Sequence, residues 1–572
     1  MSESFSGWAL LLVVIWPLLL TVGVVFAGTR PLALRGVSWA TLPALMTAGL
    51  HADSEFRLPS ILLGSGLVLD DMGRGFLLMN ATLWLAVGWL FRPRLSDAAP
   101  DRCAVLLLLA MAGGIGMSLA GDALLFFTAT TLAGYALCGL LLCNMEVAAR
   151  HAGRVLLVLL VVSDLVVFEL LLILAQEAGS VDFLLLRDAF ANTEQHALLL
   201  VLLVVGFGIK VGVAGLHFWV APVFVTAGTA VRPAVVGFML GAGLLGWLRL
   251  TPLGEVQWLA AGGVLQWLAW ITLGYAVIAG MLQTQVLSIL AYAAVALSAF
   301  LVALLGWALL YPQVWIDMAG AVLFASIQSG LALAALLLLE RRPAVSDPAW
   351  LHHLSLGATW MSAWLLAAAP ISVGKALADI DGTAASQMMW VVTAIAFLAV
   401  RSQLWPSVFC RNAHDQRPSI TVAQQATQMP TVATMAAASG LTAGALLAAM
   451  FNLVEISPAE FWLSTLVMAV AAVAAWLSVG RFMPHLPALP SGDLLAPISE
   501  GLSAVYGRGR HLGERQMSLW RDAGLAVLRH LWSGANWWRM FERVESRLNR
   551  WELVLVVLLL LGLTLAWQGA FG

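Results

Sequence analysis

The chain alternates long apolar runs with short polar connections over nearly its whole length. Most of these runs reach about 18 residues, the length that a helix needs to cross the hydrocarbon core of a bilayer. Because lipid cannot hydrogen-bond a bare backbone, such runs must form helices. The pattern predicts about sixteen membrane-spanning helices, at 8–27, 37–52, 73–91, 104–120, 122–143, 155–176, 197–225, 232–250, 256–281, 285–311, 314–340, 352–381, 386–406, 432–452, 459–480 and 551–569.

Two of the predicted spans, 197–225 and 352–381, are unusually long, and glycine or proline interrupts each of them. This pattern is typical of broken helices, which expose unpaired backbone groups beside a polar path through the membrane. The predicted fold class is therefore an all-α polytopic membrane protein with two broken helices.

One long polar stretch, 494–550, separates the last two predicted spans and contains nine arginines. Within it, Leu525, Leu528 and Trp532 recur at helical spacing, and two further tryptophans follow. The pattern predicts an amphipathic helix at the membrane surface, basic toward the headgroups and aromatic toward the acyl chains. A cytoplasmic helical tail that contacts other subunits is the alternative.

These patterns divide the chain into five segments. We expect N-terminal helices over 1–120, a core with the two broken helices over 121–410, extra spans over 411–493, the amphipathic stretch over 494–550 and a last span over 551–572.

Composition supports the membrane assignment. Of all residues, 61% are hydrophobic and only 10% are charged, and the mean hydropathy is +0.92. A soluble protein carries roughly a quarter charged residues. The first span lacks a basic leader and a small-residue cleavage site, so we interpret it as a mature helix.

Arginine predicts the orientation, because cytoplasmic loops are enriched in positive charge. With the N-terminus outside, fourteen arginines fall in loops after odd-numbered spans and nine more in 494–550, whereas the opposite side receives only Arg57, Arg74, Arg187 and Arg249. We therefore expect a multi-pass protein of a bacterial inner membrane, with its N-terminus outside.

The sequence contains no motif for a cofactor or a catalytic centre of its own. It has no GxxxxGK[ST], no HExxH and no strand-flanked GxGxxG. Its four cysteines, Cys103, Cys138, Cys143 and Cys410, lack metal or redox spacing and are interpreted as small packing residues. We expect no bound cofactor or metal, and any such chemistry would belong to a partner subunit.

The chain has two lysines, Lys210 and Lys375, among 29 basic Lys and Arg residues, and both lie in the predicted broken spans. Lysine can release its proton in a low dielectric medium, whereas arginine does not. Charges inside membrane spans usually mark a functional path. Both lysines are therefore candidate proton-relay residues; the alternatives are a structural ion pair between helices or, for Lys375, snorkelling to the interface.

Other polar residues in the predicted spans could belong to the same path. His217 follows Lys210 by seven residues, two helical turns, so both can face one path, and histidine is a residue type suited to proton transfer. Asp164 or Glu169 could balance a buried amine. Gln283, Gln285, Ser288 and Gln328 could hold water chains or only bond helix to helix.

These residues resemble the antiporter-like subunits shared by complex I, membrane-bound hydrogenases and Mrp-type cation/proton antiporters. GFGIKVGVAGLHFW, with Lys210 and His217, resembles the family's broken seventh helix, and FTATTLAGYALCG resembles its fifth. Asp164 in SDLVV and Tyr292 in ILAYAAVALSA fit the sixth and tenth helices, and Lys375 lies near the twelfth-helix lysine. The resemblance covers about 60–410, and the C-terminal layout is similar to that of the distal complex I subunit.

The chain departs from the family pattern at several charged positions. The fifth-helix glutamate, which pairs with the first lysine, falls on Thr128, and the eighth-helix lysine or histidine falls among the residues Val236–Gly241. The eleventh-helix lysine is missing from FASIQSGLALA, which keeps Gln328, and the aspartate before the LAY pattern becomes Gln285. The resemblance therefore implies either a reduced proton route or a subunit that serves a different partner.

Two functions of different classes follow. The first is a proton- or cation-translocating subunit of a complex I-like or hydrogenase-like redox assembly, without a catalytic site of its own; the resemblance implies that this assembly is an NADH-quinone oxidoreductase-type translocase. The second is a membrane subunit of a non-redox system, such as an Mrp-type antiporter or an inorganic-carbon (bicarbonate or CO2) accumulation complex. Both imply other membrane subunits, a peripheral cytoplasmic subunit, protons or other monovalent cations, and lipid as partners, and no nucleic acid.

Overall fold

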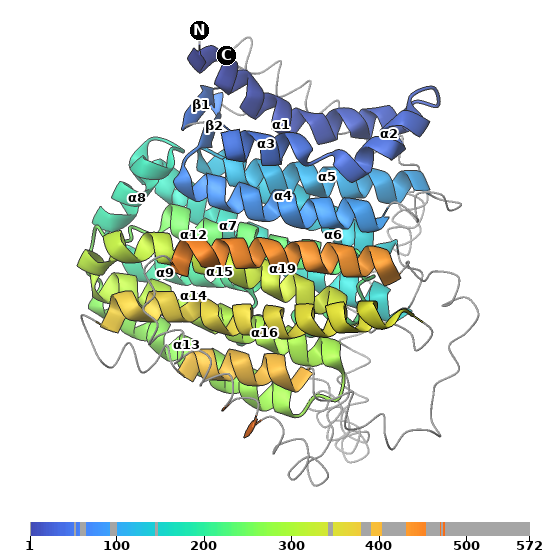
Figure 1. Ribbon diagram of the computed structural model, residues 1–572. Helices are drawn as coiled ribbons and strands as arrows, with labels where there is room; N and C mark the ends of the chain where they lie inside the picture. Colours follow the sequence, from blue (N-terminus) through green and yellow to red (C-terminus); the bar gives the residue numbers. More distant parts are fainter. Residues whose placement is uncertain are drawn as a thin grey trace, which may run out of the picture. The chain divides into compact units, whose positions relative to one another are not determined.

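The computed structural model describes residues 2–50, 53–57, 64–91, 100–143, 147–340, 347–378, 390–402 and 431–453, together with 470, 473 and 474. The chain divides into two compact units, Met1–Phe56 with Gly66–Asp493 and Arg57–Ser65 with Leu494–Gly572. The labelled helices all belong to the first unit, and Figure 1 shows them running side by side. Within the described residues, nine helices are long and apolar enough to cross a membrane.

The elements follow one another with few long connections. In chain order they are α1 (Ser2–Val25), α2 (Arg30–Gly36), η1 (Val37–Trp39), α3 (Leu42–Leu50), β1 (Ser54–Arg57), β2 (Gly66–Leu69), α4 (Asp71–Phe91), α5 (Pro100–Leu119), α6 (Ala123–Leu142), α7 (Val147–Ala178), α8 (Phe183–Asn192), α9 (His196–Val211), α10 (Val220–Thr226), α11 (Arg232–Phe238), η4 (Met239–Leu244), α12 (Leu245–Leu250), α13 (Leu259–Met281), α14 (Val286–Leu310), η5 (Pro312–Val314), α15 (Trp315–Leu339), α16 (Ala349–Ala378) and α19 (Thr431–Leu453).

The core of the first unit lies around α14 and the helix formed by α11, η4 and α12. In each of these spans 94% of the apolar window is buried, and in α15 the fraction is 89%. In contrast, only 28% is buried in α1 and 39% in α7. Because α14 is apolar on all sides, other helices can surround it completely. Helices α1, α7 and α13 keep apolar side chains exposed and lie at the periphery.

Ion pairs between chain segments respect the predicted alternation of the two membrane sides. One set joins residues that the sequence assigns to the outer side: Arg74–Asp53, Arg187–Glu255 and Arg249–Asp70. The other joins residues assigned to the inner side: Arg30–Asp101 and Arg232–Glu340. In each of these five pairs, both residues are assigned to the same side, which supports the order of crossings through α15.

The predicted second span, 37–52, is built differently from a regular transmembrane helix. It consists of η1 and the nine-residue helix α3. The chain nevertheless passes from one end of the bundle to the other here, since Arg30 pairs with Asp101 at the start of α5 and Asp53 pairs with Arg74 at the start of α4.

The prediction of a break in 352–381 is wrong over the described residues, because α16 runs as one helix from Ala349 to Ala378. Proline is tolerated inside a membrane helix when neighbours satisfy the backbone groups around it. Pro370 has no amide hydrogen, so the carbonyl four residues before it lacks its helical donor. Gln328 Nε2 of α15 donates a hydrogen bond of 2.8 Å to the adjacent carbonyl, that of Leu365.

The all-α prediction also missed a short hairpin. Strands β1 and β2 pair with each other, and β2 lies beside the start of α6, where the Gly66 amide donates to Asp122 Oδ2 over 2.9 Å. Asp122 also caps α6 through the Leu125 amide. The predicted spans at 459–480 and 551–569 and the amphipathic stretch fall outside the described residues, apart from three isolated positions in the first.

Asp70 caps α4 and also ties it to α12. Its Oδ1 accepts the Gly73 amide at 2.7 Å, and the Arg249 guanidinium donates to both carboxylate oxygens. Burial alone would raise the pKa of Asp70, but its hydrogen bonds and the charge of Arg249 hold that pKa below the ordinary 3.8.

The pH dependence of this contact can be predicted from the lowered pKa. Its stabilisation is complete above the ordinary pKa of 3.8 and is lost as the pH falls through the lower folded value. Asp70→Asn keeps a capping oxygen but removes the charge, so we expect a loss of about 1 kcal/mol, the scale for partly exposed pairs. Asp70→Ala should lose more, since it also removes the cap. Thermal unfolding of the purified protein at pH 7 and at pH 3 measures both effects, and the Asp70→Asn difference should shrink at pH 3.

Candidate functional site

The helix that contains Lys210 ends in the middle of its predicted span. α9 stops at Val211, and Gly212 adopts a left-handed conformation with φ of 84° that a residue without a Cβ tolerates. The Val213 amide returns to the Gly208 carbonyl over 3.1 Å, which closes the helix as a Schellman turn. The chain becomes helical again only at α10, so the predicted break in 197–225 is confirmed.

Side chains from neighbouring helices satisfy the backbone groups that this break frees. Ser298 of α14 donates to the Gly212 carbonyl at 3.0 Å, and Thr272 of α13 accepts from the Ala214 amide at 3.3 Å. Trp219 Nε1 donates to the Ile209 carbonyl at 2.7 Å. These hydrogen bonds therefore fix the conformation of the break between α9 and α10.

Lys210 lies at the last turn of α9 and is completely buried. Its Nζ is 2.8 Å from Asp164 Oδ1 of α7, and the Asp164 residue is only 7% exposed. The angles at these atoms fall outside hydrogen-bond geometry, so the contact is an ion pair by distance. Of the two carboxylates predicted as partners of the buried amine, Asp164 is the one that lies against it.

Asp164 and Glu169 lie on different faces of α7. Five residues turn a helix by about 500°, which leaves the two side chains about 140° apart. Asp164 therefore meets α9, whereas Glu169 is exposed on the outer face. Glu169 does not take part in the ion pair with Lys210.

His217 belongs to a different cluster from Lys210. The interpretation that the two share a helix face over two turns is wrong, because α9 ends between them. His217 is buried against two tyrosines: its ring centroid is 4.6 Å from that of Tyr275 on α13 and 6.3 Å from that of Tyr292 on α14. Tyr275 was not predicted, since a tyrosine among apolar residues of a span carries no distinctive sequence signal.

The remaining predicted residues do not converge on the ion pair through any contact between described side chains. Thr128 donates to the Leu125 carbonyl of its own helix, Gln328 binds α16, and Gln285 is exposed just before α14. Lys375 lies on α16, and its side chain is outside the described residues.

The interior next to Lys210 is apolar toward the middle of the bundle. A cavity of about 10 Å³ lies between Val211, η4, α14 and α15, and Ser298 is the one polar residue in its lining. That volume is about one water-sized sphere, and a water needs two or more polar partners. The lining includes Val236 and Met239, from the segment on which the family's eighth-helix basic residue falls. This cavity therefore does not by itself provide a chain of polar groups.

Two buried arginines were not predicted as membrane-embedded. Arg401 is fully buried, and its Nη2 donates to the carbonyls of Met281 and Gln283 at the end of α13. Arg232 donates to the Leu337 carbonyl and pairs with Glu340 over 3.3 Å. Both bind carbonyls at helix ends, where a cation also complements the helix dipole.

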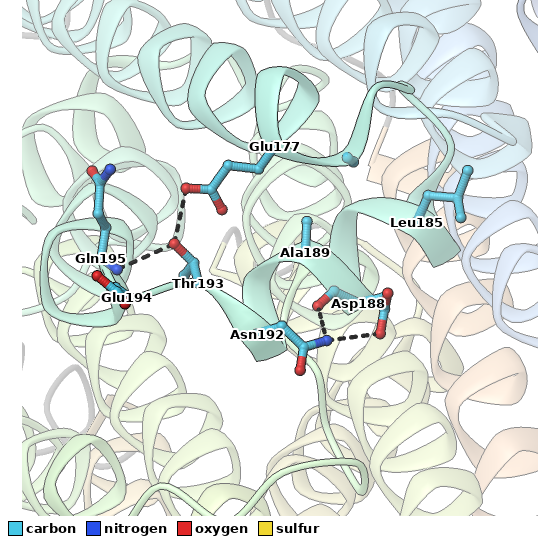
Figure 2. A pocket seen from close by; sticks show the side chains of 9 residues that line it. Glu177, Leu185, Asp188, Ala189, Asn192, Thr193, Glu194 and Gln195 are labelled. Atoms are coloured by element: carbon cyan, nitrogen blue, oxygen red, sulfur yellow. Dashed lines mark hydrogen bonds between the residues drawn. The ribbon is translucent and has the colours of Figure 1, made fainter.

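A second cavity, of about 570 Å³, opens where α7 and α8 end (Figure 2). Two of its three acidic residues accept hydrogen bonds within the lining: Thr193 donates to Glu177 at 2.9 Å, and Asn192 donates to Asp188 at 3.0 Å. Glu177 follows Asp164 by thirteen residues of helix, about 20 Å, so this cavity is remote from the ion pair. Within the described part of the chain, no three His, Cys, Asp or Glu residues gather as a metal site requires.

The pair formed by Lys210 and Asp164 can bind and release a proton. The Lys210 amine and the Asp164 carboxylate face each other out of water, so loss of one charge changes the energy of the other strongly. A broken helix beside them brings backbone dipoles and small polar groups to the same depth. Such a pair is chemically suited to proton transfer and contains no group for covalent or redox chemistry.

The sequence comparisons agree with this reading. Residues 120–374 match the family described as NADH:quinone oxidoreductase/Mrp antiporter, TM. The chain is also 27% identical over 285 residues to NADH-quinone oxidoreductase subunit N of Magnetococcus marinus, which covers 46% of this chain and 55% of that protein. The chain thus spans about half the length of this curated relative.

Solved structures share the fold at lower identity. A chain in the structure of the Mrp complex from Dietzia sp. DQ12-45-1b superposes with a TM-score of 0.65 at 15% identity, over 92% of this chain and 62% of that one. A chain of the membrane-bound sulfane sulfur reductase, an archaeal respiratory membrane complex, gives a TM-score of 0.52 at 15% identity, over 96% and 99%.

Proposed function

We propose that this chain, whose core over residues 120–374 belongs to the NADH:quinone oxidoreductase and Mrp antiporter family, is a proton-translocating membrane subunit of a complex I-like or hydrogenase-like assembly. The observation that carries the proposal is the buried contact of 2.8 Å between Lys210 and Asp164 at the break between α9 and α10. In this role Lys210 loses and regains its proton during each cycle, and Asp164 stabilises the charged state.

The chain places this carboxylate on α7, while Thr128 stands on α6 where the family has its glutamate. Thr128 is bonded to its own helix and cannot carry a negative charge. Asp164 therefore supplies the counter-charge from the neighbouring helix. We propose that His217, between Tyr275 and Tyr292, is the next residue to carry the proton. Lys375 and Gln328 then belong to the part of the proton route beyond the apolar cavity.

The experiment that tests the proposal is proton movement into proteoliposomes that contain the whole assembly, with Lys210 replaced. Other membrane subunits are required as partners, and a peripheral cytoplasmic subunit is proposed to supply the driving reaction. The chain itself contributes no cofactor to that reaction in this proposal.

The orientation in the bacterial inner membrane gives a separate prediction. In a variant without the four native cysteines, Ser4→Cys should react with a membrane-impermeant maleimide in intact cells, because the N-terminus faces outward. Arg510→Cys should react only after permeabilisation, since its stretch of nine arginines belongs inside. Labelling of Arg510→Cys in intact cells would contradict the predicted number of crossings.

A further inference from the structure

The outer face of α7 is an apolar stripe with one carboxylate in it. The residues on this face are all exposed, and Leu165, at 66%, is among the most exposed. Along the helix they are Val158, Val162, Leu165, Glu169 and Leu172. We call them the Glu169 face.

Glu169 lies at membrane depth rather than near an aqueous end. It is five residues from Asp164, about 7.5 Å along the axis, and the apolar run of α7 continues on both sides of it. A carboxylate near the middle of a bilayer costs about 2.5–3.5 kcal/mol even by the lower estimates. A lipid-facing position would therefore be unfavourable, and the face requires a group that compensates the charge.

Among the described residues, no ion pair joins Glu169 to a basic side chain. Lys210 is buried and paired with Asp164 on another face of α7. Lys375 lies on α16, which packs against α15 and α19, and Arg232 and Arg401 are bound to carbonyls at helix ends.

We expect no compensating charge from the C-terminal apolar runs. The apolar runs 459–480 and 551–569 contain no lysine or arginine. We expect the arginines of 494–550 to lie on a surface helix at headgroup level.

We propose that the Glu169 face binds a transmembrane helix of another subunit, which places a lysine or arginine against the Glu169 carboxylate. The apolar residues of the face provide the packing surface, and the ion pair fixes the register of the two helices. This inference rests on the chain being part of a membrane assembly, but not on proton transfer through Lys210.

A photocrosslinking experiment on the intact assembly in native membranes tests the occupant. A benzoylphenylalanine at position 165 probes the face while Glu169 stays in place, and the same group at Trp267, on the exposed face of α13, serves as the comparison. The expected product is a peptide from another membrane subunit with a lysine or arginine within one helical turn of the crosslink. Crosslinks to lipid alone, or to residues 494–550 of this chain, would overturn the proposal.

Substitution of Glu169 measures the ion pair independently of transport. Glu169→Leu leaves the partner's cation unpaired, so we expect at least a tenfold lower yield of that subunit when the chain is purified, since breaking a buried pair is strongly unfavourable. Glu177→Gln is the matched control, because it removes a carboxylate from the aqueous end of the same helix. If Glu169→Leu retains the partner as well as Glu177→Gln does, the proposed ion pair is wrong.

Discussion

Replacing Lys210 by alanine is expected to reduce coupled proton transport by at least a hundredfold while the assembly still forms. The residue is fully buried beside Asp164, and no other described lysine or histidine contacts that carboxylate. Removing the amine therefore removes the group that exchanges the proton, and a loss of about two orders of magnitude is the ordinary effect of losing an acid–base group. Proton uptake by proteoliposomes that contain the purified assembly measures it.

Lys210→Arg separates a proton relay from a structural cation. Arginine keeps a positive charge next to Asp164 but does not release its proton in a protein. A relay should therefore fail with Lys210→Arg nearly as completely as with Lys210→Ala. A site that needs only the charge should tolerate arginine.

The control for both variants is the amount of intact assembly, because a missing subunit would also stop transport. Wild-type transport by a fully assembled Lys210→Ala complex would rule out the relay and leave a membrane scaffold as the function of this chain. Wild-type transport by Lys210→Arg alone would reduce Lys210 to a structural partner of Asp164.

The membrane architecture could be predicted from the sequence because hydrocarbon allows few backbone solutions. The long apolar runs became α4 to α6 and α13 to α15 within a few residues of their predicted limits, and α7 begins eight residues before its predicted start at 155. Of the two predicted breaks, the one in 197–225 is present and the one in 352–381 is absent over the described residues. Whether a glycine or proline interrupts a helix depends on its surroundings as well as on its own geometry: α16 continues through Pro370, whereas α9 ends at Gly212, where Ser298 and Thr272 bond the freed backbone groups.

The ion pair could be predicted because lysine is so rare in this chain. A chain that uses arginine almost everywhere else and places Lys210 inside a broken span marks the site through composition alone. The choice between Asp164 and Glu169 follows from helix geometry only after the facing helix is known. The cluster of His217 with Tyr275 and Tyr292 could not be predicted, since it depends on where α9 ends and how α13 and α14 pack around the break.

The pairing with Asp164 changes what the missing fifth-helix glutamate means. Loss of that carboxylate would leave Lys210 held by desolvation alone, which favours a neutral, space-filling residue. The structure instead places Asp164 Oδ1 2.8 Å from the amine, so a counter-charge is present. The chain therefore keeps a lysine–carboxylate pair at this depth with the acid on α7, and the charge state of the pair depends on both residues.

Asp164→Asn is expected to destabilise the protein by about 3–5 kcal/mol, the cost of leaving one charge of a buried pair without its partner. Asparagine has nearly the same shape, so packing against α9 is preserved and the loss reports the charge. The double variant Asp164→Leu/Lys210→Met removes both charges with apolar groups of similar volume, and such replacements are often neutral or stabilising. Thermal unfolding of the purified protein should therefore rank Asp164→Asn well below the double variant, which should approach the wild type.

Glu169→Gln is the matched control, since it makes the corresponding acid-to-amide change on the exposed face of α7. In detergent, without a partner subunit, it should leave the unfolding temperature within about 1 °C of the wild type, because exposed substitutions seldom exceed about 0.5 kcal/mol. If the double variant is as unstable as Asp164→Leu and Lys210→Met combined, measured as single variants, Lys210 and Asp164 are not coupled. That result would show that the ion pair is not the basis of proton exchange. Proton exchange at this pair requires that the charge of one residue changes the energy of the other.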